Sequence, residues 1–239
     1  MRALWMSIAL LLSLSACGRY FPTALRPVPQ QGEGMEVNDD GSVTYNLGRL
    51  AVSVKPMTDA ELNRQFAGAS TGGAAALNPY TFGDWAEAGD DFTPPRFTVF
   101  RVQVNNYEFP KVRLDPLKMN ITTSNNRQYP PLSYADLYGY YRAHWQGNTG
   151  RGRVEFRSRT DLLKQTLYSG ATIFSGRDEE GYVVFPRLAD DVKEIVVHIE
   201  EMAVRFDYAD LPTETVNLSY AFERDVLRGF TPGDAVVSN

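Results

Sequence analysis

Two neighbouring segments decide the fold, IVVHIEEMAVRF (residues 195–206) and VNLSYAF (residues 216–222). In the second segment apolar side chains occupy every other position, which places them on one face of a β-strand. In the first segment the apolar positions have one parity up to residue 199 and the opposite parity from residue 202. A one-position shift in a period-two pattern predicts a β-bulge at Glu200 and Glu201. The two segments therefore predict two long strands, the first of them bulged.

The same alternation predicts further strands upstream. Residues 43–47 and 50–54 flank Asn46-Leu47-Gly48-Arg49 and predict a β-hairpin. Residues 97–104 predict a strand with apolar side chains on both faces, one face formed by Phe97 and Val99 and the other by Phe100, Val102 and Val104. Shorter strands are expected at residues 112–114, 117–121 and 182–185, with Asp115-Pro116 as an interruption and Pro186 as an end.

Three helices are expected in the connections. Thr58 and Glu61 form a capping-box pattern, which predicts a helix from Asp59 to about Ala67 that ends at Gly68. Ser133 precedes a stripe at helical spacing, formed by Tyr134, Leu137, Tyr138, Tyr141 and Trp145. A last short helix is predicted over residues 161–168, with Thr160 as its cap.

These elements predict a mainly β fold. About seven strands, mostly with hairpin-like links and without a βαβ series, favour an immunoglobulin-like antiparallel β-sandwich with two or three short helices in the connections. A small antiparallel barrel is the alternative.

The first seventeen residues indicate export. After Met1-Arg2 an apolar run reaches Leu14, too short for a permanent membrane helix but typical of a secretory signal. Leu14-Ser15-Ala16-Cys17 follows, and this sequence resembles the lipobox of bacterial lipoprotein precursors. The resemblance implies cleavage between Ala16 and Cys17 and a lipid on the Cys17 thiol. It also implies an extracytoplasmic protein anchored to a membrane, with Gly18 favouring the outer membrane. The predicted sandwich looks like the accessory domains of such lipoproteins.

The domain organisation follows from these segments. We expect a signal peptide at residues 1–16, a lipidated Cys17 with a Pro/Gly-rich tether at 17–34, a sandwich domain at 35–226 and a polar tail at 227–239.

Composition argues against several classes of protein. The chain has 239 residues and a formal net charge of -5, which argues against general nucleic-acid binding. One Cys and two His residues provide no zinc-binding pattern, and pairs of acidic residues lack the spacing of a calcium loop. We therefore expect no metal and no cofactor other than the lipid on Cys17.

Catalysis has little support in the sequence. His144 and His198 are isolated, and no nucleophile-elbow or zinc-protease motif is present. We therefore predict no catalytic residues and no enzyme activity.

Charge is unevenly distributed along the chain. A basic stretch contains Arg151, Arg153, Arg157 and Arg159, whereas residues 178–214 are strongly acidic. The arginines are candidate contacts for an anionic envelope component. Alternatively, the two stretches lie near each other and neutralise internally, or both are solvated; this second interpretation is favoured.

Aromatic side chains allow two interpretations as well. Tyr80, Phe82, Trp85 and Phe92 fall in an irregular segment, and the sequence does not decide whether residues 78–92 pack on the core or form a binding loop. The stripe of the helix after Ser133 is expected to pack on the core rather than on a glycan.

Three functions remain. The leading hypothesis is a lipid-anchored, non-catalytic binding or scaffold module of the cell envelope, in contact with the membrane and with an envelope protein or anionic component. The alternatives are an assembly or chaperone-like subunit of an envelope or secretion complex, and a cell-envelope hydrolase.

Overall fold

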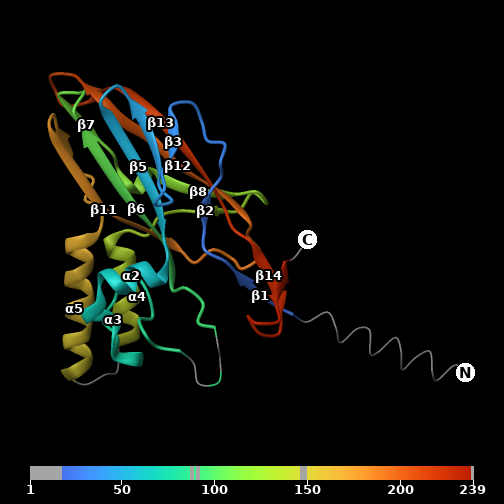
Figure 1. Ribbon diagram of the computed structural model, residues 1–239. Helices are drawn as coiled ribbons and strands as arrows, with labels where there is room; N and C mark the ends of the chain where they lie inside the picture. The colour runs from blue at the N-terminus through green and yellow to red at the C-terminus, as the bar shows by residue number, and fades with distance from the viewer. Residues whose placement is uncertain (1–17, 87–88, 90–91, 146–149, 238–239) are drawn as a thin grey trace, which may run out of the picture.

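The computed structural model describes residues 18–86, 89, 92–145 and 150–237. Two antiparallel β-sheets pack face to face, and a group of helices lies at one end of them (Figure 1). A small third sheet lies beside the same end (Figure 1). The mainly β, antiparallel sandwich expected from the sequence is confirmed.

The first large sheet has five strands in the order β11-β6-β5-β4-β3. The strands are β3 (Met35–Val37), β4 (Val43–Leu47), β5 (Leu50–Met57), β6 (Phe97–Asn106) and β11 (Arg177–Pro186). Leu47 pairs with Leu50, so the predicted hairpin is confirmed and turns at Gly48, whose φ of 59° favours glycine.

The second large sheet follows the order β10-β7-β12-β13-β2. These strands are β10 (Thr172–Phe174), β7 (Lys111–Arg113), β12 (Glu194–Phe206), β13 (Pro212–Glu223) and β2 (Arg26–Pro27). Strand β8 (Met119–Thr123) pairs with β12 and with β9 (Gln128–Tyr129).

The bulge expected in β12 is confirmed. Ile199 pairs with Leu218, but the next pair is Met202 with Val216, and Glu201 has a φ of 51°. The Glu201 N–H donates to the Asn217 side chain at 2.7 Å, which compensates for a lost ladder hydrogen bond.

The main core fills the space between the two large sheets. Its largest side chains are fully buried and include Phe100, Phe185, Phe222 and Tyr220. The Phe100 ring lies 5.9 Å from that of Phe185 and 5.5 Å from that of Phe222, both measured between centroids. These contacts join strands of both sheets into one hydrophobic core.

A second core, the aromatic core, lies on the opposite face of the first sheet, beneath the helices. Its buried members are Leu62, Tyr80, Phe97, Val99, Leu137, Tyr141, Phe156, Leu163, Tyr182 and Val184. The helices are α2 (Asp59–Gln65), α3 (Ala67–Ser70), α4 (Tyr134–Trp145) and α5 (Gly150–Thr166). The helical end is therefore three layers deep: helices, first sheet and second sheet.

Strand β6 serves both cores, as its pattern predicts. Phe97 and Val99 belong to the aromatic core, whereas Phe100, Val102 and Val104 belong to the main core. Strand β11 does the same with Tyr182 and Val184 on one face and Val183 and Phe185 on the other. Side chains that alternate across a strand allow one sheet to be covered on both sides.

Several predicted boundaries are wrong. Helix α5 begins at Gly150, so Thr160 is no cap; its hydroxyl donates to the Phe156 carbonyl within the helix. Gly68 does not end the helical region, because α3 includes it. Leu117 lies in a short 3₁₀ turn rather than a strand.

Parts of the predicted tether and of the predicted polar tail form strands. Strand β1 (Arg19–Pro22) pairs with β14 (Val226–Gly229), which pairs with β15 (Val236–Val237). We call these three strands the small sheet. Proline and glycine suggested an irregular chain for the tether, but short strands tolerate proline at an edge.

Candidate functional site

A groove beside the helical end contains Asp59, a carboxyl whose pKa is raised above its ordinary value. This groove, the Asp59 groove, has a volume of about 230 Å³ and a mostly apolar lining that also includes Arg224 and several threonines. Its walls come from the chain after β1, the start of α2 and the start of β6; they include Leu25, Met57, Phe97 and Val99. The groove therefore brings together segments that are distant in sequence.

The Asp59 side chain is placed in this groove by the helix start. Thr58 caps α2 by accepting from the Glu61 N–H at 3.2 Å, and the Glu61 carboxylate accepts from the Thr58 N–H at 2.9 Å. This capping box confirms the prediction and fixes Asp59 as the first helical residue. Burial raises the pKa of the Asp59 carboxyl to about 6, and the positive charge of Arg96 opposes part of that rise. A carboxyl that titrates near neutral pH in an apolar groove marks a candidate binding site.

Arg96 lies under the helical layer beside Tyr141. Its guanidinium carbon is 4.3 Å from the Phe82 ring centroid, and Nη1 donates to the Tyr141 hydroxyl at 2.8 Å. That hydroxyl donates to the Pro79 carbonyl at 2.6 Å. The segment around residues 78–92 is thus pinned to the core where it is described, with Tyr80 fully buried and Phe82 half-buried.

Three of the four arginines predicted to contact an anion have described side chains, and these three do not share one exposed face. Arg153 and Arg157 are exposed one turn apart on α5. Arg159 points inward, where its Nη2 donates to the Ala76 carbonyl at 2.7 Å and burial lowers its pKa. The side chain of Arg151 lies outside the described part of the chain. The exposed basic face is therefore smaller than the sequence suggested.

The acidic stretch is paired with other cations. Arg127 forms an ion pair with Asp191, and the Glu201 and Asp210 carboxylates pair with Lys118 and Lys111. Among the ion pairs of the described residues, none joins Arg153 or Arg157 to this stretch. Neutralisation of one stretch by the other is thus not the arrangement found.

His198 lies on the outer face of the second sheet. Its Nδ1 is 3.0 Å from the Ser219 hydroxyl oxygen on the neighbouring strand, and Glu200 and Glu201 border the same shallow depression. The side chain lies on the face of β12 opposite to the buried Val197 and Ile199. The His144 side chain, like that of Trp145, lies outside the described residues.

Metal-binding clusters and membrane-spanning helices are both absent from the described residues. Within residues 18–237, apart from the gaps given above, no group of three or more metal-binding side chains is assembled. No helix in that same described part combines the length and apolarity needed to span a membrane. Ala16 and Cys17, where cleavage and lipidation are predicted, lie outside the described residues.

A second apolar groove of about 330 Å³ lies between the two long helices and β11. This Tyr134 groove is lined by Leu132, Tyr134, Leu167 and Tyr182, and Lys164 stands at its wall with Nζ 5.7 Å from the Tyr134 ring centroid. Neither groove was predicted from the sequence, because each is formed where segments that are distant in the sequence meet.

Comparisons with known proteins yielded one distant likeness. No protein-family model matches the chain, and no curated protein matches it significantly. The crystal structure of MPT63, a secreted protein from Mycobacterium tuberculosis, is similar over 66% of this chain and 83% of its own. The sequence identity is 14% and the TM-score is 0.30. The sandwich assignment therefore rests on the strand pairing and core of this chain.

Proposed function

We propose that the protein is a lipid-anchored envelope protein whose sandwich domain is a non-catalytic binding module. The observation that supports binding is the Asp59 groove, an apolar recess with one carboxyl of raised pKa. Such a recess fits a compact, mainly apolar ligand group with one hydrogen-bonding atom. The anchor rests on the sequence Leu14-Ser15-Ala16-Cys17, and no soluble cofactor is part of the proposal.

The groove can be tested with a neutral naphthylamine dye, which fluoresces in apolar sites. Ala24→Trp places an indole at the groove wall, because Ala24 is exposed and lines it. We expect this substitution to reduce the dye signal shown by the wild-type protein, with the remaining signal coming from the Tyr134 groove. The control is Ala135→Trp, an exposed position on α4 outside the groove. Equal dye fluorescence in the wild type and both variants would refute a binding role for the groove.

The anchor is tested separately by metabolic labelling with a radioactive fatty acid. The wild-type protein should incorporate label, and Cys17→Ser should not. Equal labelling of the two proteins would refute both the lipid anchor at Cys17 and the membrane location inferred from it.

A second candidate function, a subunit of an envelope assembly, is favoured by the opposite end of the sandwich. There, a surface that we call the tip exposes the apolar side chains of Tyr107, Phe174, Tyr208 and Leu211. The turn is held in place, because Asp207 accepts hydrogen bonds from the Ala209 and Leu211 N–H groups at 2.9 and 2.8 Å. Pre-ordered exposed apolar groups are typical of protein contacts. Crosslinking from intact envelopes through the tip would test it; loss of a specific adduct in Tyr208→Ser would support this function.

A hydrolase is the weakest of the three proposals. The His198–Ser219 pair would need a carboxylate on the other imidazole nitrogen and a substrate cleft. The pair lies instead on an open sheet face, beside a shallow depression. An ester or peptide hydrolysis activity that is lost in Ser219→Ala would overturn the non-catalytic assignment.

A further inference from the structure

The small sheet presents apolar and basic side chains at the point where the described chain begins. Tyr20 on β1 lies opposite Arg228 on β14, and Arg228 lies opposite Val236 on β15. Directly opposed residues in antiparallel strands share a face of the sheet, so these three side chains form one row. Tyr20 is 38% exposed and Val236 is 69% exposed.

Phe230 follows directly after the end of β14, two residues beyond Arg228. It is 65% exposed and follows Gly229, the last residue of the strand. The turn after it is ordered, because the Asp234 carboxylate accepts from the Thr231 N–H at 2.7 Å and from the Thr231 hydroxyl at 2.9 Å. These hydrogen bonds also lower the pKa of Asp234, with the backbone donor as the main cause. An exposed phenyl ring is thus held on a defined turn rather than on a loose terminus.

The other face of the small sheet is attached to the body of the protein. Phe21 is buried, and its ring packs edge-on against Phe92 with 5.2 Å between the centroids. The Thr23 N–H donates to the Asp225 carbonyl at 2.9 Å, which ties the ends of β1 and β14 together. Phe21 thus fixes the small sheet to the body, and Tyr20 lies on the opposite face of β1, at the edge of a recess that Phe92 and Arg187 also line.

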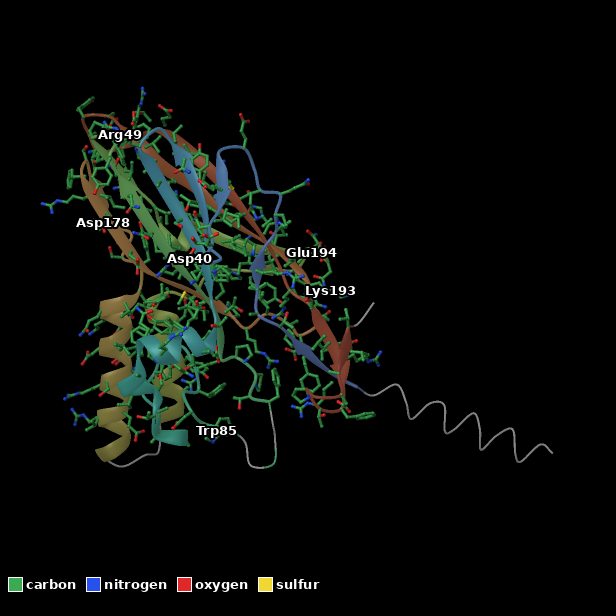
Figure 2. All side chains as sticks on the ribbon, in the orientation of Figure 1. Asp40, Arg49, Trp85, Asp178, Lys193 and Glu194 are labelled. Atoms are coloured by element: carbon green, nitrogen blue, oxygen red, sulfur yellow. The ribbon has the colours of Figure 1, made fainter. Side chains whose placement is uncertain are left out.

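The short spacing between Cys17 and β1 limits how far the small sheet can lie from a lipid on Cys17. Only Gly18 separates Cys17 from β1, which begins at Arg19. Two Cα–Cα steps span at most about 7.6 Å. A lipid on Cys17 would therefore hold the small sheet against the bilayer surface rather than at the end of a flexible tether. Figure 2 shows the small sheet at the lower right, on the side of the molecule remote from the end that carries Arg49.

The chemistry of the row fits the interfacial region of a bilayer. Phenyl and valyl side chains favour the acyl boundary, and tyrosine places its hydroxyl among headgroups. The Arg228 guanidinium carbon lies 5.7 Å from the Tyr20 ring centroid, from which the long side chain can reach lipid phosphates. We propose that Tyr20, Phe230, Val236 and Arg228 form a membrane-contact surface that inserts into the headgroup region of a phospholipid bilayer. This inference rests on the proposed anchor at Cys17 and adds the surface that meets the lipid.

A tryptophan placed in this surface tests the inference in the full-length, processed protein. Phe230→Trp should show a blue shift and a loss of emission on vesicles of phosphatidylethanolamine and phosphatidylglycerol with brominated acyl chains. The matched control is Tyr208→Trp, because Tyr208 is fully exposed at the tip. This control should be quenched no more than the parent protein, whose own tryptophans set the background.

A second variant distinguishes insertion of the small sheet into the bilayer from mere nearness to the bilayer. Adding Tyr20→Ser and Val236→Ser to Phe230→Trp should reduce the quenching by at least twofold, because two apolar side chains of the proposed surface are removed.

The outcomes distinguish the inference from the anchor. If Cys17 carries fatty acid but Phe230→Trp is quenched no more than Tyr208→Trp, the contact surface is refuted and the anchor stands. If Cys17 carries none, the anchor fails, and quenching of Phe230→Trp at high vesicle concentration still supports the surface. A blue shift that depends on protein concentration without lipid would overturn the inference in favour of self-association.

Discussion

The main core and the aromatic core are built from different chemistry on the two faces of one sheet. The main core consists mostly of aliphatic side chains and includes two buried tyrosines, Tyr168 and Tyr220. The Tyr220 hydroxyl donates to the Val52 carbonyl at 3.0 Å. The aromatic core buries several hydroxyls, including those of Tyr80, Tyr141 and Tyr182, each with a hydrogen-bond partner. Aliphatic packing needs shape alone, whereas the aromatic core also needs its polar atoms paired.

The largest effect is expected in the main core. Phe100→Ala removes the ring that contacts both Phe185 and Phe222, and we expect it to lower the free energy of unfolding by about 3–5 kcal/mol. Chemical denaturation measures this change. Phe230→Ala, at an exposed site, is the control and should change stability by less than about 0.5 kcal/mol. Similar losses in both variants would contradict the described packing.

A smaller loss is expected from a single hydroxyl of the aromatic core. Tyr141→Phe leaves the Pro79 carbonyl and an Arg96 nitrogen without their partner, and we expect a cost of about 1–3 kcal/mol. Tyr220→Phe removes one hydrogen bond from the main core and should cost about 1 kcal/mol. Equal losses in the free energy of unfolding for the two substitutions would contradict this difference between the cores.

Loss of the N-terminal cap of α2, a helix that packs on the aromatic core, should lower stability less. Thr58→Ala removes both the acceptor for the Glu61 N–H and the hydroxyl that donates to the Glu61 carboxylate, at an expected cost of about 1 kcal/mol. Amide hydrogen exchange should increase in α2 while that of β12 and β13 stays unchanged. Thr58→Ser keeps the hydroxyl and should restore protection; faster exchange in the distant strands would show that the cores are not separable in this way.

The smallest effect concerns pH. The folded-state pKa of Asp59, about 6, lies above its ordinary value, so the folded protein binds a proton that the unfolded chain has released. Stability should therefore fall as pH rises from about 4 to about 6. Asp59→Asn should remove this contribution and stabilise the protein at pH 7 by less than about 1 kcal/mol, because a charge at the helix start offsets part of the gain. Thermal melts across that pH range measure the slope, and an unchanged slope in Asp59→Asn would assign it to another group.

The two cores also differ in how far the sequence predicts them. Alternating apolar residues predicted the strands of the main core and even the bulge at Glu201, because a half-buried strand has to keep its period. The aromatic core depends on Tyr80, which lies in an irregular segment without any period, so only its aromatic content suggested burial. Arg159 was predicted to be at the surface, since a guanidinium buried against Tyr141 has no sequence signature.

The candidate site was predictable only in part. The capping box placed Asp59 at a helix start, but the sequence did not show that residues 22–25 and Arg224 close a groove around it. The small sheet was missed because its strands are two to four residues long and one contains proline. Such strands form through pairing between the two ends of the chain rather than through local preference.

Strands β6 and β11 contribute side chains to both the main core and the aromatic core, so a change in either strand affects both cores. A one-residue insertion in the middle of β6 would turn Phe100 toward the helices and leave smaller or polar groups facing the second sheet. Both the main core and the aromatic core would then lose packing. Length changes should therefore be excluded from this strand during evolution, while the same change at Gly48 would be absorbed by a turn. The shared strands also leave no boundary along which the helical layer could be cut away as a separate folding unit.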